Sequence, residues 1–293
     1  MDHLLHPDLR FVAQNVLGGL AYGSLLFLIA SGLTLVFGLM RIINLAQTAF
    51  YLLGAYVGLT LVAHGTNFWL ASAAAGIVTM VLGLAVYRAF LHRYHADPLT
   101  SLLLTLGFTL ILDDAILAIW GGDPHSIAPP PALAGSVQLG TLVFPVYWLA
   151  VIVLSVVVAA VMFIALQRTM LGVMIRASVD DEEMARGLGV DVNRAFYVVF
   201  AAGALIAGIG GLLGGPITSA YPGLDGELTP LAFAVVIVGG MGSLSGALVG
   251  SLLIGLVNAF GKAMFPELSY FTIFVPVALI MAFRPQGLFG RKL

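Results

Sequence analysis

Long apolar runs alternate with short polar ones along almost the whole chain. Each run is about 18 residues or longer, which at 1.5 Å per residue is enough to cross the roughly 30 Å hydrocarbon layer of a membrane as a helix. Alternating strand patterns are absent, so helices rather than a β-barrel are expected. The pattern predicts about eight to ten spanning helices, the last two regions being broken by glycines and by Pro266. The runs cover residues 14–38, 44–63, 68–88, 99–120, 146–167, 194–214, 229–249 and 250–284.

Composition makes this an integral membrane protein. Hydrophobic residues are 60% of the chain and charged residues 9%, whereas soluble domains carry about 25% charged residues. The mean hydropathy is +1.07. We therefore expect an all-α, polytopic transmembrane bundle that forms a single domain over residues 1–293. The polar start, MDHLLHPDLRF, lacks the basic region of a signal peptide, so the first helix is expected to act as its own insertion signal.

Most basic residues lie in three polar segments, which predicts the orientation of the chain. These segments are Arg88–Arg93, Arg168–Arg194 and the stretch from Arg284 to the C-terminus, whereas residues 121–145 and 215–228 contain no Lys or Arg. Loops rich in Lys and Arg stay on the cytoplasmic side of a membrane. The three basic segments are therefore predicted to be cytoplasmic, and the two others to lie outside.

The segment at about 168–193 is the longest polar interruption of the pattern. Ser178 is predicted to cap a short helix that runs to Leu188, because acidic residues follow in its first turn, where the helix dipole favours them. Gly187 and Gly189 should end it, and Asp191 or Asn193 can cap the next membrane helix. A soluble subunit can grip such a helix as a rigid lever. The alternative is a free solvated loop.

Polar groups inside the predicted helices indicate where a solute could pass. Arg41, Asn44, Gln47 and Thr48 interrupt an apolar stretch, and the last three are spaced so that one helix face would carry them. Asp113 and Asp114 lie roughly 10 Å deep in their helix, where an unpaired carboxylate is expensive. They either face a watery vestibule, where they would meet a cationic group of a solute, or pair with neighbouring helices.

A run of small residues near the C-terminus, GGMGSLSGALVG, contributes the remaining pathway candidates. Gly242, Gly246 and Gly250 have the spacing that lets two helix backbones approach closely. The run fits either tight helix packing or a broken helix beside a substrate path. The predicted pathway residues are Asn44, Gln47, Thr48, Asp113, Asp114, Gly239, Gly240, Gly242 and Ser243.

The sequence holds no catalytic constellation. The histidines lack the spacing of a metal site such as HExxH, and no GxxxxGK[ST] motif is present to bind nucleotide phosphates. Cysteine is absent, which excludes disulfides and thiolate metal sites. We expect no enzyme, no metal site and no cofactor on this chain, so ATP hydrolysis, if it drives the protein, belongs to another subunit.

Four blocks of the sequence resemble the permease subunits of bacterial ABC importers of the branched-chain amino acid (LivH) class. They are GLTLVFGLMRIINLAQ, the polar segment, AFAVVIVGGMGSLSGALVGSLLIGL and RPQGLFG. In the polar segment, the resemblance assigns coupling to the ATPase to Thr169, Gly172, Arg176, Asp180, Asp181, Glu182, Glu183, Ala185 and Gly189.

This resemblance implies an ABC importer permease fold and a set of partners. They are a second, related permease of the LivM class, two cytoplasmic ATPases that carry ATP and Mg, and a periplasmic binding protein that delivers the solute. It also implies a multi-pass protein of the bacterial inner membrane. Branched-chain or other hydrophobic amino acids are the expected solutes, with urea, short amides and aromatic acids as others of the class.

The chain also departs from the family pattern. Where Asn-Phe-Ala-His-Gly is common, it has Asn44-Leu45-Ala46-Gln47-Thr48, and Asp113-Asp114 stands where amides are common. Both changes bear on the solute. The competing hypothesis is an ion-gradient-driven carrier or passive channel in which Asp113 and Asp114 bind a cation or proton.

Overall fold

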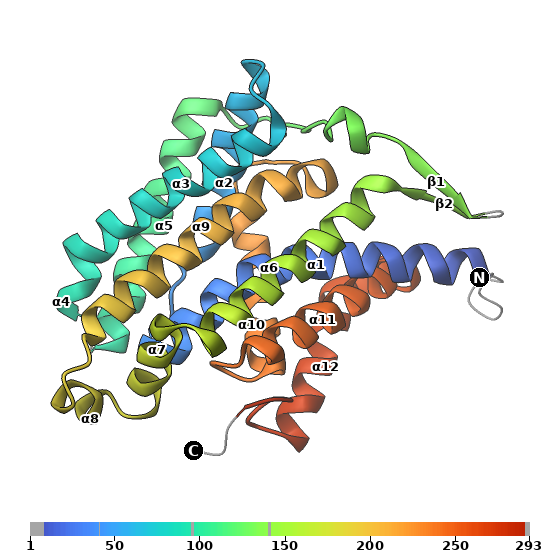
Figure 1. Cartoon of the computed structure of the whole chain (residues 1–293). Coiled ribbons are helices and arrows are strands. Elements are labelled where there is room, and N and C mark those ends of the chain that lie inside the picture. Colours follow the sequence, from blue (N-terminus) through green and yellow to red (C-terminus); the bar gives the residue numbers. More distant parts are fainter. Residues whose placement is uncertain (1–8, 41, 95–96, 140–141, 291–293) are drawn as a thin grey trace.

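The computed structural model describes residues 9–40, 42–94, 97–139 and 142–290 of the chain. This part is almost entirely helical, with one short β-hairpin (Figure 1), so the prediction of an all-α bundle is confirmed. Arg41, Arg291 and Lys292, which the sequence analysis used, lie outside the described residues.

Seven helices are long and apolar enough to cross a membrane. They agree with the predicted runs up to residue 214. The third continues beyond Val86 through a π-helical turn, Tyr87–Leu91, into α4 (His92–Tyr94). The seven are α1 (Leu9–Met40), α2 (Ala46–Ala63), α3 (Phe68–Val86), α5 (Pro98–Trp120), α6 (Val146–Arg168), α9 (Val192–Thr218) and α11 (Leu244–Met264).

Two further helices are shorter. α10 (Leu224–Gly239) has 16 residues and α12 (Ser269–Phe283) has 15, which gives lengths of about 24 and 22 Å, less than the roughly 30 Å hydrocarbon layer. With the seven long helices they fall within the predicted eight to ten.

The predicted span at 229–249 is wrong, because it joins the end of α10 to the start of α11. Gly240 and Gly242 lie at φ 101° and 79°, in the left-handed region that favours glycine, so the chain turns there. Glycines were predicted to break the last two apolar regions, and the structure places one break at Gly240 and Gly242, where hydropathy alone shows a continuous apolar run.

Helix α1 runs through the middle of the bundle and packs against α9, α10 and α11 (Figure 1). Glycines allow its close approach to α11: a Cβ on Gly19 would meet Leu256, and one on Gly23 would meet the backbone of Ser251. Small residues serve the same purpose between α2 and α9, where Gly54 faces Gly208. Backbone contact of this kind is the usual basis of helix association in membranes.

The two predicted outer segments lie side by side. His125 and Ala220 exchange backbone hydrogen bonds of 2.7 and 2.9 Å, which joins the loop after α5 to the loop after α9. The same loop forms an antiparallel hairpin, β1 (Ser136–Leu139) and β2 (Leu142–Pro145), near the N-terminal end of α1 (Figure 1). α4, α7, α8 and the stretch from Arg284 to Gly290 lie away from the hairpin, so the described parts of the three basic segments share the other end of the bundle (Figure 1).

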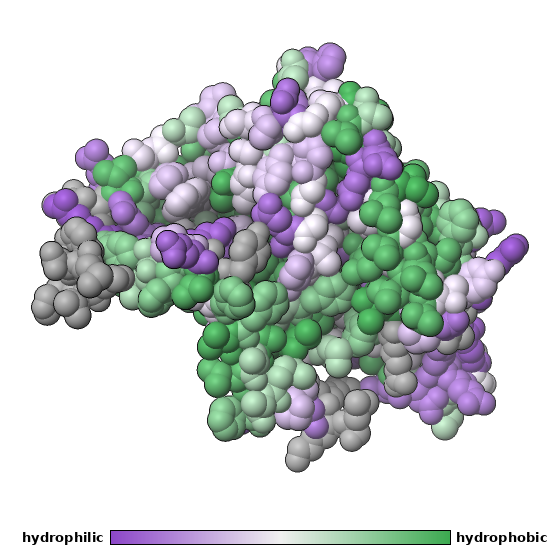
Figure 2. All heavy atoms as spheres, turned by 180° about the vertical axis from the view of Figure 1, so that it is seen from behind, coloured by the Kyte–Doolittle hydropathy of each residue, from purple (hydrophilic) through white to green (hydrophobic). Residues whose placement is uncertain are grey.

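Apolar side chains dominate the outer faces of α5 and α6. Leu110, Ile111, Val157 and Ile164 each expose half or more of their surface. Figure 2 shows apolar residues over the middle of one face, with hydrophilic residues gathered towards its ends. Such a surface is stable only against lipid or another apolar protein.

Candidate functional site

The polar segment begins with a sharp turn that folds α7 (Met170–Asp180) back against the end of α6. The Thr169 hydroxyl caps α7 by accepting the Gly172 N–H at 3.1 Å. A Cβ on Gly172 would collide with the carbonyl oxygens of Ala165 and Leu166, so only glycine fits this turn. Arg176 donates a hydrogen bond to the Leu166 carbonyl, one of the last carbonyls of α6.

The helix predicted from Ser178 to Leu188 is instead two helices. Ser178 lies inside α7, where its hydroxyl donates to the Met174 carbonyl at 2.8 Å, so its predicted capping role is wrong. Asp181 caps α8 (Glu182–Gly187) by accepting the Met184 N–H at 2.9 Å. The error arose because Ser and Asp are equally good caps, and the two lie only three residues apart.

The end of the polar segment agrees with prediction. α8 ends at Gly187, and Gly189 follows at φ 83°. Asp191 caps α9 by accepting the Arg194 N–H at 3.0 Å. Arg186 joins both helices, because its guanidinium pairs with Glu182 at 2.9 Å and donates to Asn193 Oδ1 at 3.1 Å. α8 is therefore attached firmly to the start of α9.

The surface of this segment is both acidic and apolar. All four acids from Asp180 to Glu183 are exposed. Beside them Met184 exposes 61% and Leu188 77% of their surface, although both lie on a connection between spanning helices. Ala185, by contrast, is buried and anchors α8 to the core. Exposed apolar side chains rimmed by charges are typical of a protein docking surface.

Three pathway candidates, Asn44, Gln47 and Thr48, do not share a helix face as predicted. Asn44 precedes α2, and its Oδ1 accepts the Ala46 N–H at 3.1 Å. Thr105 of α5 supports this non-helical stretch, because its hydroxyl accepts the Leu45 N–H at 3.3 Å. Asn44 is buried, and its Nδ2 has no hydrogen-bond partner among the described residues. An unpaired amide inside a membrane protein is a candidate contact for a solute.

Gln47 and Thr48 connect helices. Gln47 fills the space between Gly32 of α1 and Gly203 of α9, and its Nε2 donates to the Gly203 carbonyl at 2.9 Å. The Thr48 hydroxyl lies 2.7 Å from that of Thr229 on α10. Both residues are buried, so a pathway role for them stays a prediction that requires movement of the helices around them.

Asp113 and Asp114 have different surroundings. Asp114 is exposed on the outer face of α5, whereas Asp113 is half-buried beside Asp225 at the start of α10. The Oδ1 atoms of Asp113 and Asp225 are both buried, and neither makes a hydrogen bond of ordinary geometry with another described residue. Two neighbouring carboxyl groups attract only when one of them holds a proton. Asp225 had been assigned to an outer loop, but α10 starts at Leu224 and buries it.

The glycine-rich pathway candidates form a tightly packed break rather than an open channel. Gly239 faces the backbone of Gly246, and Gly242 faces Gly38 of α1. The RPQGLFG segment closes over the break: the Leu288 N–H donates to the Val238 carbonyl at 2.8 Å, and Phe289 donates to Gly239 at 3.0 Å. The run is therefore both tightly packed and a break between two helices, whereas its place beside a substrate path stays a prediction.

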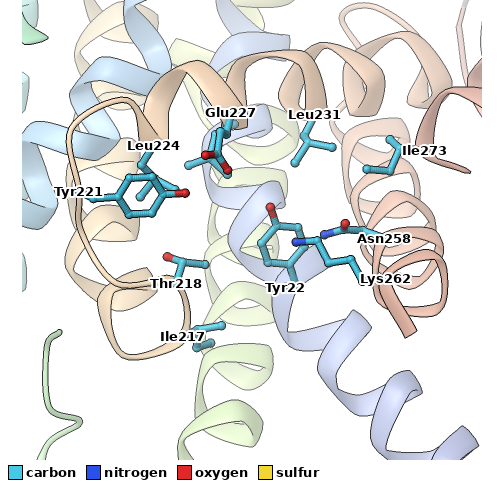
Figure 3. Close-up of a pocket in the computed structure, with 11 residues that line it drawn as sticks. Tyr22, Ile217, Thr218, Tyr221, Leu224, Glu227, Leu231, Asn258, Lys262 and Ile273 are labelled. Carbon is cyan, nitrogen blue, oxygen red and sulfur yellow. The ribbon is translucent and has the colours of Figure 1, made fainter. Parts of the chain in front are cut away.

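A pocket of about 280 Å³ opens between α1, the end of α9, α10, α11 and α12 (Figure 3). Leu224, Leu228, Leu231 and Ile273 form much of its apolar lining, while Tyr22, Thr218, Tyr221, Glu227, Asn258 and Lys262 are polar. It lies towards the end of the bundle that carries the loop after α9.

Sequence reasoning missed this pocket. Glu227 belongs to residues 215–228, which were predicted to lie outside the membrane. Asn258, Lys262 and Tyr22 were not singled out, because they are scattered through apolar runs. One signal was available: Lys262 is the only Lys or Arg between Arg194 and Arg284. A lone basic residue within an apolar run is expensive enough to indicate a specific partner.

Comparison with known proteins provides a family context. Residues 15–283 match the family model described as "Branched-chain amino acid transport system / permease component". The chain is 30% identical to the high-affinity branched-chain amino acid transport system permease protein BraD of Pseudomonas aeruginosa, over 97% of this chain and 98% of that protein. It is 27% identical to LivH of Escherichia coli K12, over 96% of each. Similarity extends to LivM of the same bacterium, at 30% identity over 88% of this chain and 66% of LivM.

Proposed function

The chain belongs to the permease-component family of branched-chain amino acid transport systems, and from that premise we propose that it is the LivH-type subunit of an ATP-driven importer. It is a multi-pass membrane protein, which in a bacterium lies in the inner membrane. The family consists of transport permeases rather than enzymes. In this proposal two separate ATPase subunits bind ATP and Mg and hydrolyse the ATP.

The coupling role rests on the surface of α7 and α8. Exposed Met184 and Leu188 offer an apolar docking surface beside the acids, while Arg186, Ala185 and Asp191 fix α8 to α9. Because α9 contacts α1, α2 and α3, a force on α8 is passed to the centre of the bundle. This is the arrangement that a lever requires. An ion-gradient-driven carrier would have no use for it, and the family match does not favour that alternative.

A second permease completes the proposed assembly. The broad apolar faces of α5 and α6 provide candidate surfaces for a related, LivM-type chain, and the similarity of this chain to LivM supports a pair of related subunits. A binding protein delivers the solute to the end that carries the hairpin.

Branched-chain amino acids are the proposed solutes, because the relatives BraD and LivH are named for their transport. A tagged copy of the chain should be purified with its associated subunits and reconstituted in vesicles with the neighbouring binding protein. We expect leucine uptake that requires ATP and survives a proton ionophore. Uptake that persists without ATP and stops with the ionophore would refute the proposal.

The solute can be identified independently of uptake. The binding protein is screened for compounds that raise its melting temperature, since a ligand that binds only the folded state adds stability by mass action. A shift with leucine, isoleucine or valine is expected. A shift with urea, an amide or an aromatic acid instead would change the solute but retain the ATP-driven mechanism.

A further inference from the structure

The pocket in Figure 3 is lined by two side chains of opposite charge that do not pair with each other. Glu227 extends from α10 and Lys262 from α11, and both line the pocket. No ion pair joins these two side chains. Lys262 instead lies with its Nζ 5.6 Å from the centre of the Tyr22 ring. A carboxylate and an ammonium that both open into one cavity complement a ligand that has both charges.

Asn258 adds a third polar contact. It lies one helical turn before Lys262 on the same face of α11, and only 3% of its surface is exposed. Its Oδ1 has no hydrogen-bond donor in the described part of the chain. A buried acceptor without a donor costs about 1–3 kcal/mol. A ligand with N–H groups removes that cost, and a primary ammonium offers three of them.

The rest of the lining is aliphatic. Leu224, Leu228 and Leu231 of α10 and Ile273 of α12 are nearly or fully buried and present only methyl and methylene groups. The volume of about 280 Å³ lies just below the range of about 300–1,000 Å³ for drug-sized ligands. The pocket therefore suits a small molecule with a charged head and a short apolar tail.

We infer that this pocket binds an aliphatic α-amino acid as a zwitterion during its passage through the protein. Glu227 and Asn258 receive the α-ammonium group, Lys262 receives the α-carboxylate, and the leucines of α10 contact the side chain. The inference rests on the proposed function and deepens it, because it assigns the solute to residues outside the pathway predicted from the sequence.

The test uses the complete transport complex in phosphatidylcholine nanodiscs, with binding of radiolabelled leucine as the readout. Glu227→Gln and Lys262→Met should each weaken leucine binding by about tenfold or more. Glu267→Gln is the matched control, because Glu267 is an exposed acid in the turn after α11 that does not line the pocket. Elution volume and the recovery of every subunit after purification verify that each variant is assembled.

Two analogues separate the charged contacts. Leucinamide retains the ammonium but lacks the carboxylate, and 4-methylpentanoate has the reverse arrangement. Lys262→Met should abolish the preference for leucine over leucinamide and retain the preference for leucine over 4-methylpentanoate. Glu227→Gln should abolish the preference over 4-methylpentanoate and retain the preference over leucinamide. Unchanged preferences in both variants would overturn the inference, even if overall affinity fell.

The outcomes distinguish this inference from the proposed function. If uptake stays ATP-driven but leucine binding is unchanged in all pocket variants, the protein is still an importer and the pocket is not its amino acid site. Uptake that does not need ATP refutes the importer, whatever the pocket binds. If leucine binding is unchanged in Glu227→Gln and Lys262→Met, but the retention of added phosphatidylethanolamine falls in both variants, the pocket is a lipid headgroup site and the inference is wrong.

Discussion

Asp113 and Asp225 show how far single residues can be interpreted from sequence. The cost of a carboxylate within an apolar helix identified Asp113, but its neighbour comes from α10, more than a hundred residues away, and no local pattern links them. From the sequence, Asp113 and Asp114 were predicted to act together. The structure separates them, because adjacent residues on a helix point about 100° apart, and only Asp113 faces the bundle.

Asp113→Asn should stabilise the protein. The amide removes the contact between two carboxyl groups, and its Nδ2 can donate to Asp225. A gain of about 1 kcal/mol corresponds to a rise in melting temperature of about 2–4 °C for a protein of this size class. Thermal unfolding in detergent measures it, with Asp114→Asn as the exposed control. A lower melting temperature for Asp113→Asn alone would show that the carboxylate is needed where it stands.

Gln47→Ala should destabilise the bundle rather than only alter transport. The substitution deletes the hydrogen bond to the Gly203 carbonyl and leaves a void between α1 and α9, so we expect a loss of about 1–3 kcal/mol. The same unfolding assay checks this. Asn44→Ala is the comparison, because Asn44 lies beside rather than between those helices. Equal melting temperatures for Gln47→Ala and the wild type would contradict the structural role.

At the scale of elements, hydropathy predicted helices well and their breaks poorly. Burial in lipid demands an apolar run of fixed length, so the first six runs agree with observed helices. The turn at Gly240 and the division between α7 and α8 depend on backbone conformation and on the choice between two good caps, neither of which hydropathy reports. The polar segment at about 168–193 lies between α6 and α9, but it holds two helices where one was predicted, and its coupling role stays a prediction.

The acids of the coupling segment should separate into two classes on substitution. Glu183→Lys should reduce uptake per ATP hydrolysed several-fold without changing the melting temperature, because Glu183 is exposed and is not the cap or the partner of Arg186. Asp181→Ala should instead cost about 1 kcal/mol of stability, since it removes the cap of α8. Uptake and ATP hydrolysis are measured together in vesicles. Normal coupling in Glu183→Lys and in Leu188→Asp would exclude this surface as the contact with the ATPases.

At the scale of the whole molecule, the structure groups the predicted cytoplasmic segments at one end and the predicted outer ones at the other. Charge statistics yielded that grouping without any tertiary information, because orientation depends on where Lys and Arg lie along the chain. The pocket could not be found in this way. Its lining comes from five helices, and only their packing brings Tyr22, Glu227 and Lys262 together.

The orientation itself has a direct test. The chain contains no cysteine, so single-cysteine variants are labelled at one place only. Val137→Cys in the hairpin should react with a membrane-impermeant maleimide in intact spheroplasts, whereas Glu183→Cys should react only after the membrane is opened. Labelling of Glu183→Cys in sealed cells would show that the orientation is the reverse of the predicted one, with the polar segment out of reach of cytoplasmic ATPases.

The closure of RPQGLFG over the α10–α11 break has a consequence for biosynthesis. Translation runs from the N-terminus, so Leu288 and Phe289 are made well after the carbonyl groups of Val238 and Gly239 to which they bond. Until these two residues dock, both carbonyl groups lack those partners. A nascent chain that stalls before Leu288 would therefore leave the α10–α11 break incomplete and expose it to quality-control proteases.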